Sequence, residues 1–257
     1  SETSIRRYRP CSADGAVGMT VGSLFSGIGG FDPGFERAGY DVRWQVEIDD
    51  YANRVLAKHW PNVKRYRDIR AIDWRDVEPV DVVCGGFPCQ PHSVAGRRRA
   101  SKDDRDLWPE VVRCLRETRP GWFVGENVTG LLSSEDGRFF GTVLRDLAAC
   151  GFDVEWDCLP AADFGANHLR ERVWIAAYRH GERSQKRQVL SSFPGQAGRN
   201  DDGKDTAVGD WGAAGPRVVR AFHGIPKRVD RVRTLGNAIV PQVAEWLAGR
   251  ILAADAD

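Results

Sequence analysis

The 257-residue sequence has few of the features that mark a membrane or secreted protein. No apolar run approaches the roughly 20 residues that a membrane-spanning helix needs. No signal peptide with an apolar centre opens the chain. The net charge is only +1, so charge alone indicates neither a nucleic acid nor an acidic partner. These absences predict a globular protein that associates with no membrane.

The sequence also has no cysteine framework. Its six cysteines show none of the spacings of a disulfide scaffold, and the pair Cys84 and Cys89 lacks further histidines or cysteines placed to complete a zinc site. We therefore expect reduced thiols, no metal, and a cytoplasmic location.

What is present is a regular alternation of two patterns. Apolar, β-rich runs alternate with segments of helical spacing, which is typical of an α/β fold with a mostly parallel sheet between helices. The predicted strands are residues 19–25, 42–48, 80–88, 121–128, 152–161 and 170–178. The predicted helices are residues 31–40, 49–60, 106–120, 138–151 and 236–253.

Two segments lie outside this alternation. Residues 1–18 are polar and aperiodic, which predicts a flexible tail. Residues 179–216 are polar, rich in glycine and aperiodic, and a loop of this length is usually functional or disordered. The helix that follows carries Pro241, which is acceptable in a first helical turn.

A glycine-rich turn, "LFSGIGG", follows the first predicted strand. A strand, a glycine turn and a helix offer backbone N–H groups to a ligand at the carboxyl end of a sheet. The dinucleotide fingerprint needs a third glycine where this chain has Asp32, and a carboxylate there would repel a pyrophosphate. Glu47, at the end of the second strand, is placed to accept hydrogen bonds from ribose hydroxyls. A nucleoside cofactor without a pyrophosphate fits both observations, although a purely structural turn would also explain the glycines.

Cys89 lies in "GGFPCQPHS", directly after a proline and past the end of a predicted strand. Ligands bind at such strand ends, and the arginines of the polar segment that follows would favour a thiolate. This placement indicates a nucleophile. The alternative is a small buried residue, which is the usual role of a free cysteine.

Three charged residues could complete a reaction site. Glu126 ends the strand that follows the Cys89 strand in sequence, and burial there would let it donate a proton at neutral pH. A solvated carboxylate is the alternative. Arg170 and Arg172 alternate along a predicted strand and so share one face, with no evident acid beside them, which favours an anionic ligand.

Five motifs then form a recognisable set. "FSGIGG", "FPCQP", "ENV", "RERVW" and "GNAIVPQ" occur in this order and resemble the cytosine-5 DNA methyltransferases. The resemblance covers residues 19–178 and 216–250. It implies a Rossmann-like mixed, mostly parallel sheet that binds S-adenosylmethionine, with a very small target-recognition region inserted before the last helix. The implied domains are a tail (1–18), a catalytic domain (19–178), a target-recognition region (179–233) and a C-terminal helix (234–257).

The resemblance also implies roles for individual residues. Cys89 matches the nucleophile, Glu126 the acid, and Arg172 with its neighbour Arg170 the arginines that hold the target cytosine. The implied cofactor contacts are Phe25, Ser26, Gly27, Ile28, Gly29, Gly30, Glu47, Ile48, Asp68, Ile69, Pro88, Leu107, Asn237 and Ile239. Contacts to double-stranded DNA are expected from Gln90, Ser93, Arg97, Arg183, Gln185 and Arg187.

Several questions stay open at this level. His92 stands where the family usually has phenylalanine, either as a harmless substitution or as a pH-dependent contact to DNA. Family members that methylate transfer RNA share the catalytic motifs, and a catalytically silent homologue is a third hypothesis. The target sequence, the oligomeric state and a place in a restriction–modification system or a phage are not determined by the sequence.

Overall fold

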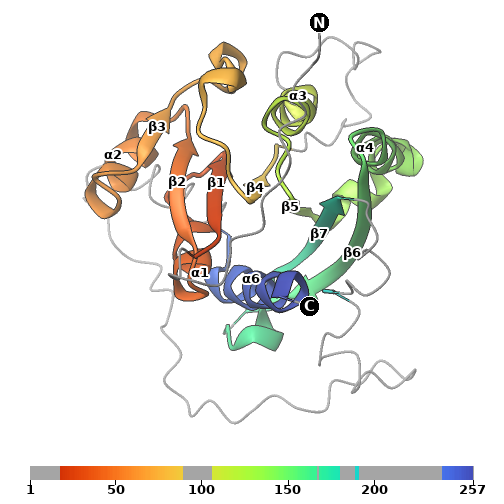
Figure 1. Cartoon of the computed structure of the whole chain (residues 1–257). Helices are drawn as coiled ribbons and strands as arrows, with labels where there is room; N and C mark the ends of the chain where they lie inside the picture. The colour runs from red at the N-terminus through yellow and green to blue at the C-terminus, as the bar shows by residue number, and fades with distance from the viewer. Residues whose placement is uncertain (1–17, 89–105, 167, 180–188, 191–238, 257) are drawn as a thin grey trace, which may run out of the picture.

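The computed structural model describes residues 18–88, 106–166, 168–179, 189–190 and 239–256 (Figure 1). A seven-stranded sheet lies at the centre, in the order β3-β2-β1-β4-β5-β7-β6. The strands are β1 (Thr20–Leu24), β2 (Asp41–Val46), β3 (Lys64–Tyr66), β4 (Val82–Gly86), β5 (Trp122–Val128), β6 (Phe152–Pro160) and β7 (Glu171–Arg179). The first five are parallel, and β7 runs antiparallel to both β5 and β6. The predicted α/β class with a mixed, mostly parallel sheet is confirmed.

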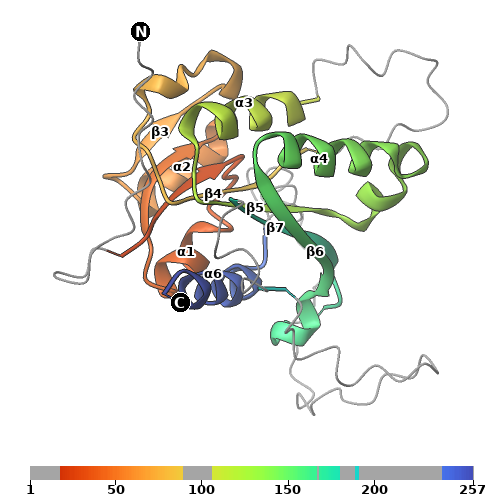
Figure 2. The ribbon, with the colours of Figure 1, turned by 45° about the vertical axis from the view of Figure 1, so that its right-hand side comes forward.

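Helices cover both faces of this sheet. The α-helices are α1 (Asp32–Arg37), α2 (Asp50–His59), α3 (Trp108–Thr118), α4 (Arg138–Ala149) and α6 (Pro241–Ala256). The short 3-10 helices are η1 (Ile69–Ala71), η2 (Trp74–Asp76), η4 (Thr129–Gly137) and η5 (Ala161–Phe164). Figures 1 and 2 show α1 and α6 together on one face and α3 and α4 on the other. Each pair encloses its own hydrophobic core against the sheet.

The strand order determines where a ligand can bind. The chain leaves β1 for β2 on one side and later enters β4 on the other, so the order reverses around β1. Because all five parallel strands point the same way, their carboxyl ends lie along one edge. The residues that follow β1, β2, β3, β4 and β5 therefore share that edge.

The C-terminal helix packs closely on α1. A side chain at Gly34 would place its Cβ 2.5 Å from the carbonyl oxygen of Pro241, which only a glycine avoids. The hydroxyl of Tyr40 donates a hydrogen bond to the carbonyl of Ala248 at 3.1 Å. The last helix therefore packs with the first elements of the chain.

Two sequence-based expectations need correction. The last helix begins at Pro241 rather than at residue 236, since Ile239 and Val240 precede it in non-helical conformation. Proline disfavours helical geometry in the residue before it and is itself well suited to the first helical position. The strand β3 was not predicted, because its three residues, Lys-Arg-Tyr, carry charge instead of an apolar run.

Asp32 lies inside the protein. Its carboxylate accepts a hydrogen bond from Gln45 Nε2 at 2.7 Å, and Ser23 Oγ lies 3.5 Å away. Burial raises the pKa of Asp32 to about 6, and the Gln45 hydrogen bond offsets this only in part. The argument that Asp32 would repel a pyrophosphate assumed that its carboxylate faces the ligand, whereas the structure encloses it against the first two strands.

No helix in the described ranges is long and apolar enough to cross a membrane.

We expect the Asp32→Asn variant to gain stability over the wild-type protein as the pH rises. The wild-type carboxyl stabilises the fold fully below its unfolded pKa of 3.8, and this contribution is lost as the pH rises through about 6. The difference in free energy of unfolding between variant and wild type should therefore grow by about 2.4 kcal/mol from pH 4 to pH 7. Urea denaturation across this range measures it. A difference that stays constant with pH would contradict the assignment.

Candidate active site

A tight turn follows β1 at the carboxyl edge of the sheet. Gly27 and Gly29 adopt positive φ angles of 57° and 87°, which glycine reaches at least cost. Phe25 also has a positive φ of 51°, an uncommon conformation for an aromatic residue that indicates a constrained backbone. The amide of Gly29 donates to the carbonyl of Ser26 at 2.8 Å and closes the turn. The predicted glycine turn is therefore a tight turn closed by a backbone hydrogen bond.

The carboxylate of Glu47 holds this turn from the neighbouring strand. One oxygen accepts a hydrogen bond from the Gly27 amide at 2.7 Å, and the other accepts one from the Asp49 amide at 2.7 Å. A carboxylate oxygen can accept more than one hydrogen bond, so each keeps capacity for a further donor such as a hydroxyl. Glu47 therefore orders the turn and could bind a ribose with the same two atoms.

The end of β3 lies next to Glu47. The amide of Glu47 donates to the carbonyl of Tyr66 at 3.0 Å, which places Asp68 and Ile69 two and three residues beyond this contact. Asp68 caps η1 by accepting from the amide of Arg70 at 3.0 Å. Ile48, next to Glu47, is 60% exposed.

Ile239 reaches the same turn from the far end of the chain. A Cβ at Gly30 would lie 2.8 Å from the Ile239 backbone nitrogen, and one at Gly86 would lie 3.3 Å from Ile239 Cδ1. Ile239 thus lies between the glycine turn and the end of β4. Gly30 and Ile239 are both predicted cofactor contacts, and the fold makes them neighbours although they are far apart in sequence.

Glu126 lies further along the same edge. It is only 8% exposed, and burial raises the pKa of its carboxyl to about 7, although Arg172 and Arg170 partly oppose the rise. Arg172 Nε lies 3.3 Å from Glu126 Oε1. A carboxyl with this pKa is protonated in about half of the molecules at neutral pH, so it can donate a proton there.

The two arginines differ from the sequence-based prediction in one respect. Both guanidinium groups lower the pKa of the Glu126 carboxyl, so both lie near this carboxyl. The prediction that no acid stands beside them is wrong, because the partner comes from a different strand. Val128 of β5 is paired with Arg172 of β7, and this antiparallel register brings Glu126 within reach. Arg170 precedes β7 with a positive φ of 29°.

Sequence reasoning gave Asn127 no role. This buried side chain donates from Nδ2 to the carbonyl of Phe87 at 2.9 Å, and its Oδ1 accepts from the amide of Val128 at 2.9 Å. It therefore fixes the backbone at the end of β4, one residue before Pro88. The signal in the sequence is its position directly after Glu126 in the motif "ENV".

Two further predicted cofactor contacts lie in the described ranges, and other predicted site residues lie outside them. Pro88 follows β4 and Leu107 directly precedes α3, where it packs against the core on the α3 face. The residues outside the described ranges are Cys89, Gln90, His92, Ser93, Arg97, Arg183, Gln185, Arg187 and Asn237. Among the described residues, no group of three or more histidine, cysteine, aspartate or glutamate side chains could hold a metal ion.

The described part of the edge has two halves with different chemistry. The glycine turn, Phe25, Glu47 and the start of η1 offer a constrained backbone, an aromatic ring and a carboxylate, which suit a nucleoside. Glu126 with Arg172 offers a proton donor beside a cation. Gly86 lies between these halves, since a Cβ there would be 3.1 Å from Glu126 Oε2.

The chain is similar in sequence to a known protein family and to several of its members. The family model of the C-5 cytosine-specific DNA methylases matches residues 19–207. The Type II methyltransferase M.Bsp6I of Bacillus sp. is 35% identical over 64% of this chain and 53% of its own length. The Type II methyltransferase M.NgoBI of Neisseria gonorrhoeae is 37% identical over 60% of this chain and 49% of its own length. The chain thus spans about half the length of these relatives.

Solved structures show the same fold. A protein described as a DNA modification methyltransferase from an E. coli prophage superposes with a TM-score of 0.55 at 27% identity, covering 63% of this chain and 47% of that one. The Dnmt2 methyltransferase of S. pombe superposes with a TM-score of 0.53, covering 64% of this chain and 52% of that one. Its 23% identity makes this second likeness one of fold alone.

The pKa of Glu126 tests the geometry of this edge. We expect the carboxyl to titrate near pH 7 in the wild-type protein, as followed by NMR of ¹³C-labelled glutamate. In the Arg172→Met variant the Glu126 carboxyl should titrate at a higher pH, because the substitution removes the guanidinium that lowers its pKa more than Arg170 does. The Arg138→Met variant, which changes an exposed arginine on α4, is the control and should leave the titration unchanged. An ordinary glutamate titration in the wild-type protein would show that Glu126 is not buried as described.

Proposed function

Because the chain belongs to the family of C-5 cytosine-specific DNA methylases, we propose that it transfers a methyl group from S-adenosylmethionine to carbon 5 of cytosine in double-stranded DNA. The observation that carries this proposal is the buried Glu126 paired with Arg172, on the same sheet edge as the glycine turn and Glu47. A proton donor of pKa about 7 beside a nucleoside-sized cradle suits the activation of a base.

The described residues fit the cofactor. Glu47 would accept the ribose hydroxyls, Phe25 would stack on the adenine, and Asp68 with Ile69 would contact the adenine edge. The remaining contacts proposed are Ser26, Gly27, Ile28, Gly29, Gly30, Ile48, Pro88, Leu107, Asn237 and Ile239. When bound, S-adenosylmethionine supplies an electrophilic methyl group.

The chain's own residues would activate the base. Carbon 5 of cytosine is a poor nucleophile, and the Cys89 thiolate would activate it by forming a bond to carbon 6. Glu126 donates its proton to ring nitrogen 3 as the electrons of the carbon 5–carbon 6 double bond shift, and carbon 5 becomes enamine-like. After methylation, the proton on carbon 5 leaves to a base, the sulfur–carbon bond breaks, and nitrogen 3 returns its proton to Glu126. The cysteine is released as the thiolate.

The two arginines would position the base and the acid. Arg172 holds Glu126 from β7, and Arg170 would assist it in holding the flipped cytosine. The base must leave the duplex for this reaction, at a cost of a few kcal/mol that phosphate contacts can offset. Gln90, Ser93, Arg97, Arg183, Gln185 and Arg187 are the proposed contacts to DNA, with residues 179–233 as the target-recognition region.

The substrate is tested directly. The protein is incubated with S-adenosylmethionine carrying a labelled methyl group and with either duplex DNA or transfer RNA. The proposal expects label in DNA at carbon 5 of cytosine. Label in transfer RNA alone would replace DNA as the substrate, and no transfer to either would indicate a catalytically silent homologue.

Cys89 is tested by covalent trapping. With S-adenosylmethionine present, duplex DNA containing 5-fluorocytosine should form a denaturant-resistant adduct with the wild-type protein, because after methyl transfer fluorine cannot leave carbon 5 as a proton does. The Cys89→Ala variant should form no adduct and transfer no methyl group, while its affinity for S-adenosylhomocysteine stays at the wild-type value. Gel electrophoresis and calorimetry measure the two properties.

The control for this experiment is Cys150→Ala, which removes a thiol at the end of α4, away from the carboxyl edge. It should form the adduct as the wild-type protein does. Substantial methyl transfer by Cys89→Ala would refute the nucleophile assignment.

Glu47→Gln should weaken the binding of S-adenosylhomocysteine. The amide replaces one carboxylate oxygen with an N–H donor, which would then face a backbone N–H of Gly27 or Asp49 instead of accepting from it. We expect a loss of about 1–3 kcal/mol in binding free energy by calorimetry. Asp41→Asn, at the opposite end of the same strand, is the matched control and should bind normally. Unchanged affinity in Glu47→Gln would exclude Glu47 from the cofactor site.

A further inference from the structure

The segment η1, which carries the proposed adenine contacts, is weakly held by its own hydrogen bonds. It is a single 3-10 turn, closed by bonds of 3.0 Å from the Ala71 amide to the Asp68 carbonyl and 3.5 Å from the Ile72 amide to the Ile69 carbonyl. One isolated turn of this kind is marginal in stability. Something outside the turn must therefore fix its position.

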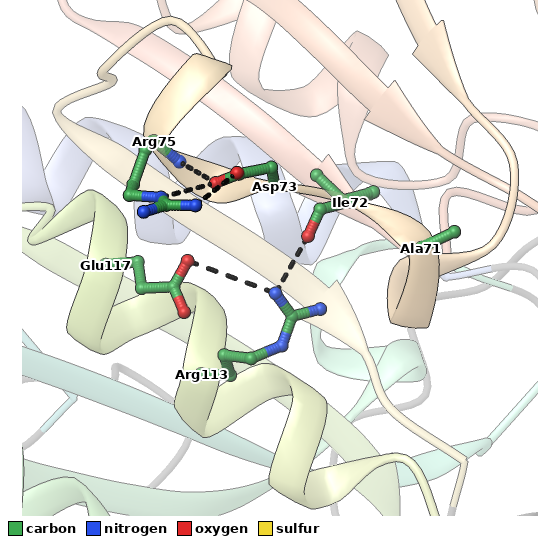
Figure 3. Close-up of a pocket in the computed structure, with 6 residues that line it drawn as sticks. All are labelled: Ala71, Ile72, Asp73, Arg75, Arg113 and Glu117. Atoms are coloured by element: carbon green, nitrogen blue, oxygen red, sulfur yellow. Dashed lines mark hydrogen bonds and ion pairs between the residues drawn. The ribbon is translucent and has the colours of Figure 1, made fainter.

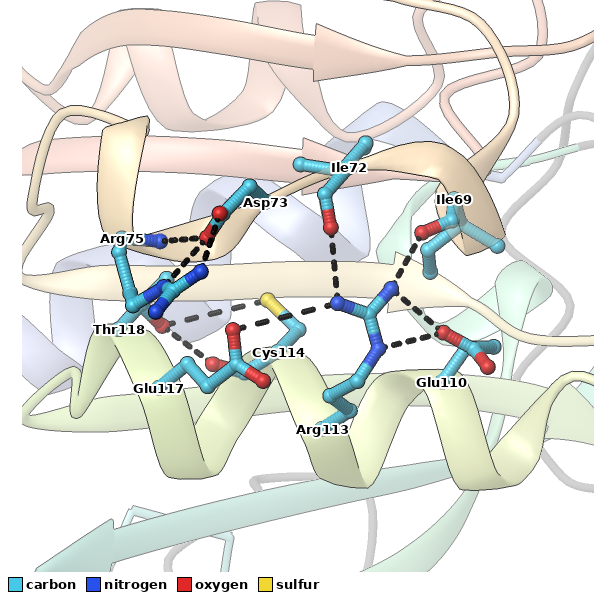
Figure 4. A network of polar contacts seen from close by, with 9 residues as sticks. All are labelled: Ile69, Ile72, Asp73, Arg75, Glu110, Arg113, Cys114, Glu117 and Thr118. Atoms are coloured by element: carbon cyan, nitrogen blue, oxygen red, sulfur yellow. Dashed lines mark hydrogen bonds and ion pairs between the residues drawn. The ribbon is translucent and has the colours of Figure 1, made fainter.

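Arg113 of α3 supplies this restraint. Its Nη2 donates to the carbonyl of Ile69 at 2.8 Å, and its Nη1 donates to the carbonyl of Ile72 at 2.8 Å (Figure 4). One planar guanidinium thus binds the carbonyls at the first residue of the turn and just after its last residue. Both isoleucine side chains are buried in the core on the α3 face, so the turn is held by packing and by charge-assisted hydrogen bonds.

The guanidinium is itself fixed by two acids of its own helix. Arg113 Nε donates to Glu110 Oε2 at 2.8 Å, and Glu117 Oε2 lies 3.9 Å from Nη1 (Figure 4). These carboxylates stand one turn before and one turn after Arg113. The guanidinium is therefore pre-oriented towards η1 rather than free to rotate in solvent.

We propose that Arg113 is a positioning residue for the adenosine end of the cofactor. The inference rests on the function proposed above, in which Asp68 and Ile69 contact the adenine and Leu107 is a further cofactor contact. Leu107 immediately precedes α3, the helix that bears Arg113. Arg113 thus ties two cofactor-contacting segments, one after β3 and one before α3, into a single unit.

The pocket beside Arg113 does not indicate a separate anion site. It has a volume of about 500 Å³ and is lined by residues 71–73, Arg75, Arg113 and Glu117 (Figure 3). Arg75 is paired with Asp73 at 2.6 Å, and Arg113 is engaged with two carbonyls and Glu110. With both guanidinium groups bound by protein oxygens, this pocket is best explained as the space between η1, η2 and α3.

The test compares two arginines that line the same pocket. Arg113→Met keeps the apolar stem and removes the donors to Ile69 and Ile72. Arg75→Met removes a guanidinium whose partner is Asp73 and which holds neither carbonyl. We expect Arg113→Met to bind S-adenosylhomocysteine about tenfold more weakly by calorimetry and Arg75→Met to bind as the wild-type protein does.

Kinetics separate positioning from a general loss of structure. Arg113→Met should raise the KM for S-adenosylmethionine about tenfold and leave kcat within about twofold, since the groups that react with the base are unchanged. Arg113→Lys, which can reach only one carbonyl at a time, should give an intermediate affinity. If Arg113→Met does not fold, the affinity of Arg113→Lys tests whether Arg113 is a positioning residue.

The outcomes are distinguishable. If wild-type protein and both Arg113 variants bind S-adenosylhomocysteine equally, Arg113 is not a positioning residue, and the proposed function stands. If the wild-type protein does not bind it, the proposed function and this inference are both overturned. A graded loss in the order wild type, Lys, Met supports the inference.

Discussion

The close approach of the C-terminal segment to the first glycine-bearing elements is the contact on which the candidate site depends. Glycine at positions 30, 34 and 86 leaves space that Ile239 and the start of α6 fill. Ile239 then lies between the glycine turn and Gly86, the residue that adjoins the carboxylate of Glu126. Interior packing has few voids, so side chains at these glycines would displace the C-terminal segment. The glycine turn and the end of β4 would then no longer both contact Ile239.

Burial determines the chemistry of the site more than net charge does. Two carboxyl groups, Asp32 and Glu126, are enclosed and have raised pKa values, and of these two only Glu126 lies at the carboxyl edge of the sheet. Asp32 is instead satisfied by Gln45 inside the sheet layer. Glu47 and Asp68 stay on the surface side, where backbone amides bind their oxygens. The carboxyl edge thus holds one buried carboxyl with a raised pKa, that of Glu126, and two acids, Glu47 and Asp68, that accept hydrogen bonds from backbone amides.

Much of this arrangement is predictable from the sequence, because apolar periodicity and the order of motifs are local signals. The six predicted strands and four of the predicted helices lie within a few residues of their predicted bounds, and Glu126 and Ile239 lie at the carboxyl edge of the sheet. The exceptions depend on tertiary contacts. The interior position of Asp32 depends on Gln45 from another strand, and the partner of Arg172 comes from β5. The hold of Arg113 on η1 joins elements that no sequence pattern relates.

The hydrogen bond from Tyr40 to Ala248 spans 208 positions of the chain and has a consequence for folding order. Closing so long a loop carries a large entropic cost before any contact is gained. During synthesis on the ribosome the first strands and α1 emerge long before α6 exists, so the nascent chain carries an exposed apolar face on α1. The contact of the glycine turn with Ile239 can form only after this last segment emerges, and until then the apolar face of α1 lacks its partner helix.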